Sequence, residues 1–214
     1  MSNFFSSFLL IGTGLALTLK LLFGCFIIGL SLGTLLAILK FCKICVHVID
    51  LFVSFLRGTP LLLQLSLIYF SVPGIFGVQL SVLSAGIIAF GINSSAYIAE
   101  ILRAGIESIP NGQFEAAISL GIPKNRMWRD IIMPQVVKNI LPALINEIVD
   151  LLKETALIAT IGGMDIMRYS QIVGAAQFNY FAPLCIAAIY YYVLVSLITW
   201  ISRLIERRTS YVKA

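Results

Sequence analysis

The sequence RAGIESIPNGQFEAAISLGIPKNRMWRDIIMP, residues 103–134, is a polar stretch between two long apolar parts of the chain. Connections in compact proteins are usually short, and long ones are often functional. The residues from Pro110 to Gly112 are a turn signal that ends the preceding helix. The residues from Gln113 to Leu120 then favour a short helix.

Side-chain chemistry gives this short helix defined ends and one nearly bare face. Glu115 stands in its first turn, where a carboxylate interacts favourably with the helix dipole. Gly121 is placed to end the helix, and Pro123 to begin the next one. Because Ala116 and Ala117 leave one face nearly bare, that face can enter a groove of another protein. We therefore interpret the polar stretch as a docking loop for a soluble partner on the cytoplasmic side.

The composition identifies lipid as the solvent of this protein. The 214 residues are 59% hydrophobic and 12% charged, with a mean hydropathy of +0.99. Soluble domains carry about 25% charged residues. We expect one membrane domain over residues 1–214, in which the docking loop spans about 107–136. The net charge of +5 does not indicate nucleic-acid binding, because the basic residues lie between apolar segments and form no continuous face.

Five segments are predicted to cross the membrane, because each offers about 20 mostly apolar residues. They run from about Leu15 to Leu39, Ile49 to Val72, Leu80 to Leu102, Ile140 to Ile161 and Ala182 to Ile205. The first cation is Lys20, so the charged region that begins a cleavable signal peptide is missing. We expect the first segment to be retained as a membrane helix.

The cations alternate between the predicted loops and so predict the orientation of the chain. They gather around the first turn, in the docking loop and near the C-terminus, at Lys40, Lys43, Arg57, Arg103, Lys124, Arg126, Arg129, Lys138, Arg203, Arg207, Arg208 and Lys213. The segment before Lys20 and the segment from Ser71 to Ser81 carry none. Since cytoplasmic loops are enriched in Lys and Arg, this pattern predicts the N-terminus outside and the C-terminus inside.

Small and polar residues on the predicted spans indicate how the helices pack. Gly29, Gly33 and Ala37 are four residues apart and form a stripe that lets another helix approach closely. We also expect hydrogen bonds between helices from Asn93, Ser94 and Ser95, ion pairs of Arg103 with Glu100 and Glu107, and packing or interface anchoring by Tyr190, Tyr191, Tyr192 and Trp200.

Cys42 and Cys45 form a C-x-x-C pair, which in some proteins indicates redox or metal chemistry. No second pair occurs, and the sole histidine is His47. Structural zinc normally requires four ligands. We therefore predict no metal site in this chain.

The predicted fourth span carries five polar or ionisable side chains, namely Asn146, Glu147, Asp150, Lys153 and Glu154. At about 100° per residue, Glu147 and Glu154 share one helix face. Asp150 and Lys153 are three apart and can form an ion pair. Ionisable groups at membrane depth cost about 2.5–3.5 kcal/mol each and are functional candidates. The structural alternative is a self-neutralising network between helices.

The docking loop resembles the cytoplasmic EAA loop of bacterial ABC-importer permeases. The resemblance is carried by Glu115-Ala116-Ala117, then Gly121, then Ile131 to Pro134, with Met133 where leucine is usual. Segments 57–64, 95–103, 110–113, 141–147 and 151–157 are similar to the polar amino-acid permease branch of that family. The likeness runs from about Gly12 to about Arg208, almost the whole chain.

This resemblance implies an all-α type I importer subunit in a bacterial inner membrane. Two permease subunits, identical or related, would face each other, and each would insert its loop helix into a cleft of an ATPase subunit. The implied ATPase-coupling residues are Glu115, Ala116, Ala117, Ser119 and Gly121. An extracytoplasmic solute-binding protein would deliver a polar amino acid such as glutamine or arginine. No G-x-x-x-x-G-K-[ST] motif occurs in the sequence, so we expect ATP and Mg²⁺ to be bound by the partner, and no cofactor or catalytic residue in this chain.

The resemblance also favours a substrate pathway along the fourth span, at Glu147, Lys153, Glu154 and Thr155. Asn146 and Asp150 are further candidates on the same segment, and for Asp150 a purely structural ion pair is an equal alternative. Thr59 is a candidate because Pro60 breaks the helix beside it, and freed carbonyl groups there could line a cavity. The plainer interpretation is that Pro60 begins a helix.

Three other functions are alternatives to an importer permease, and each explains only part of this pattern. An ion-coupled secondary amino-acid transporter would use Glu147 and Glu154 without an ATPase. A membrane enzyme lacks a convincing set of catalytic residues here. A structural subunit of a secretion complex would not need acids and a lysine on one buried face.

Overall fold

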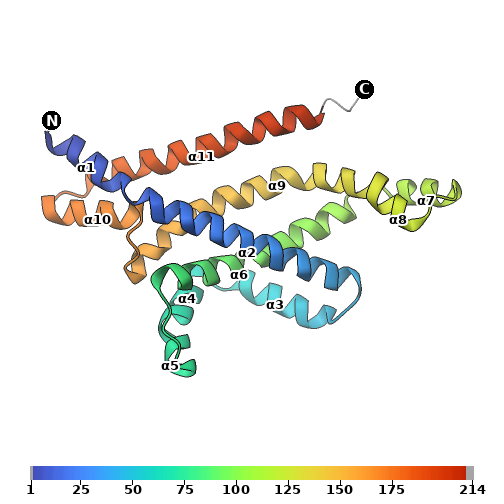
Figure 1. Cartoon of the computed structure of the whole chain (residues 1–214), viewed down its shortest axis with the longest axis horizontal. Helices are drawn as coiled ribbons and strands as arrows, with labels where there is room; N and C mark the ends of the chain where they lie inside the picture. The colour runs from blue at the N-terminus through green and yellow to red at the C-terminus, as the bar shows by residue number, and fades with distance from the viewer. Residues whose placement is uncertain (1, 211–214) are drawn as a thin grey trace.

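The structure, a computed structural model, describes the backbone of residues 2–210 and the side chains of residues 4–205. Within this part the secondary structure is entirely helical, which confirms the all-α prediction (Figure 1). The elements are α1 (Ser2–Gly12), α2 (Leu15–Phe41), α3 (Val46–Gly58), α4 (Leu61–Ser66), η1 (Leu67–Ser71), α5 (Val72–Phe76), α6 (Val82–Glu107), α7 (Asn111–Ser119), α8 (Lys124–Arg126), η2 (Met127–Ile132), α9 (Met133–Glu154), η3 (Thr155–Ile161), α10 (Ile166–Gln177) and α11 (Phe181–Ser210). The segments η1 and η2 are π-helical, and η3 is a 3₁₀ helix.

The long helices α2, α6 and α9 pack together along the long axis of the molecule (Figure 1). α11 packs against α9 and α10. The short helices α7 and α8 form one end of the molecule, whereas α1 and α10 lie at the opposite end (Figure 1). The docking loop is therefore separated from the N-terminal helix by the length of the bundle.

Three helices in the described part are long and apolar enough to cross a membrane. They are Phe4–Phe41, Val82–Glu107 and Phe181–Ile205, and a fourth candidate is the bent pair Val46–Gly58 and Leu61–Phe76. The prediction of five spans is thus not met by length and composition alone. The segment that differs is the predicted span from Ile140 to Ile161.

That segment is helical but differs from the prediction at both ends. α9 begins at Met133 and ends at Glu154, and the chain continues as the tighter 3₁₀ helix η3 to Ile161. The same charged side chains that made α9 a functional candidate lower its hydropathy. An apolar-span criterion therefore does not select it.

Glycines allow α2 and α6 to approach closely, as the four-residue spacing predicts. A Cβ atom added at Gly29 would lie 2.9 Å from Ser94 Oγ, and one added at Gly33 would lie 2.8 Å from the backbone oxygen of Ser95. Larger residues cannot be accommodated without moving α6. Around this contact the largest core cluster joins α2, α4, α6, α9 and η3, and the side chain of Phe90 is fully buried at its centre.

The chain bends by 102° between α3 and α4. Thr59 is extended (φ −119°, ψ 146°), as expected for the residue before a proline, and Pro60 starts the next helix. The amide nitrogen of Gln64 donates to the oxygens of Leu56 (2.8 Å) and Thr59 (3.3 Å) and to Thr59 Oγ1 (2.8 Å). Asn93 also donates to the Leu56 oxygen, at 3.2 Å. The carbonyl groups of Leu56 and Thr59 at the bend are therefore satisfied within the protein.

Candidate functional site

The docking loop forms the predicted short helix, which starts earlier than predicted and ends where its glycine predicts. α7 begins at Asn111, two residues before the predicted start at Gln113. It closes at Gly121, whose φ of +66° is readily adopted by glycine, and the Ile122 amide donates to the Ala117 oxygen at 3.0 Å. Pro123 then directly precedes α8.

The exposed face of α7 differs from the bare alanine face that we expected. Glu115, Ala116 and Ser119 are exposed, but the side chain of Ala117 is only 2% exposed and packs inside the chain. Ile118 and Leu120, by contrast, are 67% and 77% exposed. The sequence pattern missed these two apolar side chains, because their direction depends on how α7 sits on the bundle.

A small apolar cluster connects the docking loop to the membrane helices. It consists of Ile109, Ala117, Met127, Ile132, Val136 and Ile140. Gly105 of α6 lies against Ile140 of α9, and an added Cβ there would overlap the Ile140 side chain. The ring of Trp128 contacts Phe41 of α2 at 5.1 Å and Phe114 of α7 at 5.8 Å between centroids. Through Trp128 and the apolar cluster, α7 is thus packed onto the part of the bundle formed by α2, α6 and α9.

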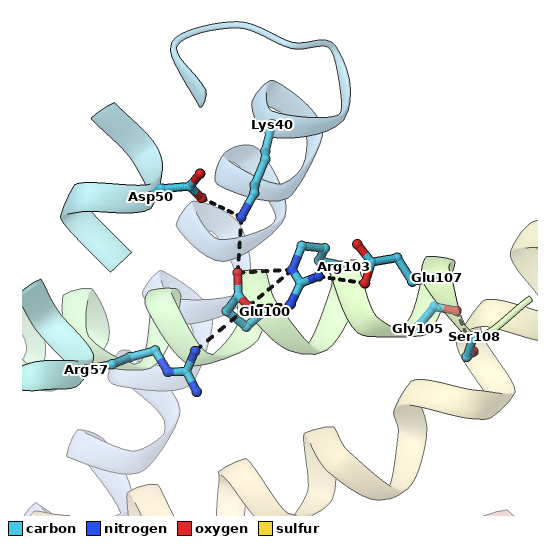
Figure 2. A network of polar contacts seen from close by, with 8 residues as sticks. All are labelled: Lys40, Asp50, Arg57, Glu100, Arg103, Gly105, Glu107 and Ser108. Carbon is cyan, nitrogen blue, oxygen red and sulfur yellow. Dashed lines mark hydrogen bonds and ion pairs between the residues drawn. The ribbon is translucent and has the colours of Figure 1, made fainter. Parts of the chain in front are cut away.

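A charged cluster lies at the same end of the bundle, centred on Glu100 of α6 (Figure 2). Arg103 Nη2 approaches Glu100 Oε2 at 2.8 Å, and Arg103 Nη1 approaches Glu107 Oε2 at 2.6 Å, which confirms both predicted pairs. Lys40 of α2 bridges Glu100 (3.3 Å) and Asp50 of α3 (2.6 Å). The cluster thus joins three helices, which the spacing of residues along a single helix could not reveal.

The polar side chains of α9 fall into an exposed and a half-buried group. Asn146 is exposed, as are Asp150 and Lys153, whose side chains are 63% and 57% exposed and form the predicted ion pair at 2.9 Å. Glu147 and Glu154 are half-buried on the adjoining face. In lipid such an exposed polar face requires protein or water against it.

Thr155 and Thr59 lie apart from that exposed face. Thr155 is fully buried in the first turn of η3, and its hydroxyl donates to the Leu152 oxygen at 2.6 Å. The half-buried Thr59 donates to the Phe55 oxygen at 2.9 Å and accepts from Gln64. Both hydroxyls are thus engaged within the chain, and their role in a pathway stays a prediction.

The family is decided by comparison with known proteins. Residues 29–211 match the family model described as "Binding-protein-dependent transport system inner membrane component". The chain belongs to this family. It is the multi-pass, non-catalytic permease component of a binding-protein-dependent ABC importer in the inner membrane. This assignment confirms the resemblance seen in the docking loop and does not support the ion-coupled alternative.

The relatives cover almost the whole permease. It is 48% identical over 208 residues to a putative glutamine transport system permease protein (GlnP) of Rickettsia typhi, covering 96% of this chain and 95% of the relative. It is 45% identical over 200 residues to the arginine transport system permease protein ArtQ of Bacillus subtilis, covering 91% and 90%.

Solved structures support the same fold. A crystal structure of an amino acid ABC transporter with histidines matches with a TM-score of 0.86 and 42% identity, covering 93% of the permease and 94% of that chain. An inward-facing MetNI methionine ABC transporter matches with a TM-score of 0.71 at 20% identity, over 93% and 94%, which is a likeness of fold.

A buried polar contact at the other end of the permease was missed by sequence analysis. Asp165 is fully buried and caps α10, where its Oδ1 accepts from the Arg168 amide at 2.8 Å. Its Oδ2 accepts from the Tyr191 hydroxyl of α11 at 3.1 Å. Burial raises the pKa of the Asp165 carboxyl, and the backbone amide of Arg168 opposes that shift. An aspartate just before a helical run was the available signal.

Cys42 and Cys45 are free and exposed in the permease. Within the described residues, no group of three His, Cys, Asp or Glu side chains is placed to hold a metal ion.

Proposed function

We propose that this permease imports glutamine- or arginine-type amino acids, working with two ATPase subunits, a second permease subunit and an extracytoplasmic solute-binding protein. The cargo class rests on the named relatives, which are glutamine and arginine permeases. The second subunit is proposed because the exposed polar face of α9 needs a cover inside the membrane.

The observation that carries this proposal is the physical continuity between α7 and α9. α7 presents exposed Ile118 and Leu120, while its buried Ala117 contacts the cluster that includes Val136 and Ile140 of α9. When ATP closes the two partner ATPase subunits, the surface that binds α7 moves and displaces this helix. The apolar cluster transfers the displacement to α9. The polar face of α9 then changes its exposure between the two sides of the membrane, which is alternating access.

The docking helix contacts the ATPase through Glu115, Ala116, Ser119 and the two exposed apolar side chains. Gly121 sets the direction in which the chain leaves the helix. Ala117 packs on the side of the helix that faces the apolar cluster. An exposed isoleucine and leucine on a polar loop are typical of side chains that a partner buries.

The pathway follows Asn146, Glu147, Asp150, Lys153 and Glu154, and its further candidates are Thr155 at the end of α9 and Thr59 at the α3–α4 bend. In this arrangement Lys153 meets the carboxylate of the cargo and Glu154 its ammonium group. In the absence of cargo, the ion pair with Asp150 positions the Lys153 ammonium group. When cargo enters, the cargo carboxylate replaces Asp150 as the partner of Lys153.

The chain crosses the membrane five times in this proposal, with its N-terminus outside and its C-terminus inside. α9 is the fourth of these spans despite its charges, because those charges face the pathway and not the lipid. The loop containing α7 and α8 then lies in the cytoplasm. Labelling of Ser119→Cys by a membrane-impermeant thiol reagent in right-side-out and inside-out vesicles tests this orientation.

Uptake by proteoliposomes tests the function itself. The permease, co-purified with its ATPase, is reconstituted with its solute-binding protein and supplied with ATP, and labelled glutamine and arginine are measured inside. We expect ATP-dependent uptake of at least one of the two. Lys153→Met and Glu154→Gln should each lower the rate by about ten-fold or more, the effect of losing one charge-assisted hydrogen bond. Normal uptake by both variants would overturn the pathway assignment.

A further inference from the structure

An open cavity of about 600 Å³ lies beside the charged cluster, between α3, α6 and α9. Arg57, Tyr97 and Glu100 line it on one side, and Asn139 lines it from α9. Small-molecule sites commonly occupy about 300–1,000 Å³. The cavity reaches Ser108, close to the turn into the docking loop. It is therefore large enough for an amino acid and lies at the docking-loop end of the bundle.

Arg57 brings unused hydrogen-bond donors to this cavity. Its guanidinium carbon lies 5.2 Å from the centroid of the Tyr97 ring, and its ion-pair contact is Glu100 Oε2 at 3.8 Å. That distance exceeds a hydrogen bond, and the Arg57 side chain forms none with the other described residues. A guanidinium carries five N–H donors in a planar fork. Arg57 is thus positioned by its neighbours and keeps the capacity to bind a carboxylate through two parallel hydrogen bonds.

The charges around the cavity favour an anionic group next to Arg57. The lining contains two cations, Arg57 and Arg103, and one acid, Glu100 (Figure 2). Arg103 is already hydrogen-bonded to Glu100 and Glu107, and Lys40 also donates to Glu100. The positive charge that is available to a ligand is therefore that of Arg57.

Asn139 adds a neutral polar group on the α9 side. Its Nδ2 donates to Ser108 Oγ at 2.9 Å, which orients the amide and leaves Oδ1 as an acceptor. A guanidinium with unused hydrogen-bond donors and an available amide acceptor in one cavity are complementary to the carboxylate and ammonium groups of an α-amino acid.

We propose that this cavity is an exit-side binding site, in which Arg57 binds the carboxylate of an amino acid after it has left the α9 pathway. This inference rests on the proposed function, because it takes the cargo class and the cytoplasmic position of the docking loop from there. Arg57 lies at the end of α3, two residues before the bend at Thr59. An amino acid bound to Arg57 therefore lies next to the point where the α3–α4 segment changes direction.

Protection of an engineered thiol from alkylation tests the site directly. Ala104 lines the cavity and is exposed, so Ala104→Cys is introduced after Cys42, Cys45 and Cys185 have been replaced by serine. The complex with its ATPase is reconstituted in nanodiscs, and the rate of labelling by a charged maleimide is measured with and without L-arginine or L-glutamine. At about ten times the dissociation constant, the effective amino acid should slow labelling by roughly ten-fold, because the reaction requires the empty site.

Matched ligands and variants identify the binding group. Arg57→Gln should weaken the concentration dependence of protection by roughly ten- to hundred-fold, the effect of losing a charged hydrogen-bond pair. Arg57→Lys keeps the charge but loses the fork, so an intermediate effect is expected. Agmatine and 4-aminobutanamide, which lack the carboxylate, should give no protection. A matched protein without the Ala104 substitution, in which Cys42 and Cys185 are replaced and Cys45 is kept as the exposed thiol, serves as the unprotected control.

The outcomes separate this inference from the proposed function. Protection by the amino acid that is lost in Arg57→Gln but kept in Lys153→Met supports an exit-side site. Protection that is unchanged in Arg57→Gln, or equal protection by inorganic phosphate, overturns it, since the site would then not select a carboxylate through Arg57. Absence of protection while the same wild-type complex imports amino acids in proteoliposomes overturns the inference alone. Absence of ATP-driven uptake overturns the proposed function instead.

A second variant covers the case in which Arg57→Gln does not assemble. Asn139→Leu removes the acceptor on the α9 side and leaves the ion pairs around Glu100 unchanged. It should weaken protection by the amino acid and leave labelling in the absence of ligand unchanged. Full protection in Asn139→Leu would also contradict the proposed site.

Discussion

The Ser94 hydroxyl of α6 donates a hydrogen bond of 2.5 Å to Glu147 Oε1 of α9. Ser94 also packs against Gly29 of α2, where an added Cβ would lie 2.9 Å from its Oγ. Three helices therefore meet at one hydroxyl group. Glu147 is thereby held on the half-buried side of α9, whereas Asp150 and Lys153 remain exposed. This contact anchors the half-buried side of α9 to α6.

Removing that hydroxyl should loosen α9 against α6. We expect Ser94→Ala to lower the stability of the purified permease by about 1.5–3 kcal/mol, the usual value of a hydrogen bond to a charged group. Glu147→Gln should cost less, since an amide still accepts from Ser94. A double-mutant cycle measured by thermal unfolding in detergent checks the coupling. Additive effects of the two substitutions would show that the pair does not interact.

The contact between α2 and α6 tolerates no side chain at Gly33. Gly33→Ala would place a methyl group 2.8 Å from a backbone oxygen, so helix separation is required and a loss of about 1–3 kcal/mol is expected. Gly74→Ala is the matched control, because an added Cβ at that position meets nothing within 4 Å. Thermal unfolding of both proteins checks the prediction. Equal stability of the two variants would contradict close packing at Gly33.

Ile118 should matter more than Gln113 for binding of the ATPase. Ile118→Asp places a charge where an exposed apolar side chain is expected to be buried by the partner, so co-purified ATPase should fall by about ten-fold or more. Gln113→Ala changes another exposed residue of α7 and should retain normal yield. The measurement is the ratio of ATPase to permease after affinity purification at equal permease stability. Full ATPase yield with Ile118→Asp would remove this side chain from the docking surface.

Ala117→Trp tests a different property, because Ala117 packs inside the permease. We expect this substitution to release α7 from the apolar cluster and to lower uptake, with increased proteolysis of the docking loop even in the absence of ATPase. Glu115→Lys, which changes an exposed side chain, should lower ATPase binding without that increase. Limited proteolysis of the permease alone separates the two effects.

The cap of α10 should depend on the side-chain acceptor of Asp165. Asp165→Ala leaves the Arg168 amide and the Tyr191 hydroxyl without their partner, and a loss of about 1–3 kcal/mol is expected. Asp165→Asn keeps one acceptor oxygen, which can still cap the Arg168 amide, and its NH2 group can donate to the Tyr191 oxygen, so this variant should cost much less. Hydrogen exchange of the first turn of α10 provides the measurement. Unchanged exchange in Asp165→Ala would show that the cap is dispensable.

Local chemistry made the docking loop predictable. The turn before α7, the glycine after it and the proline before α8 act within a few residues, so their effects do not depend on the rest of the fold. The same holds for the ion pairs of Arg103 and Lys153, which join residues three or four apart on one helix. The charges of α9 likewise identified it as unusual, although they also hid it from a criterion based on hydropathy.

The positions of side chains relative to other helices could not be predicted in this way. The sequence analysis grouped Ala116 and Ala117 on one bare face, yet Ala116 is exposed and Ala117 is buried in the apolar cluster. Thr155 follows the exposed residues of α9 in sequence but is buried, because the helix tightens at that point.

The sequence by itself determined that the chain is a helical membrane protein with a protruding loop, because span lengths, turns and caps are set by near neighbours. Tertiary structure alone decided that Lys40, Asp50 and Arg57 converge near Glu100, and that Ser94 meets Glu147. The contacts with Glu100 and the contact between Ser94 and Glu147 join residues more than 40 positions apart, and Lys40 meets Asp50 across two different helices. They depend on how closely the helices pack and on how each helix is rotated about its axis. The glycine contacts between α2 and α6 establish this packing, and the pattern of a single helix does not contain it.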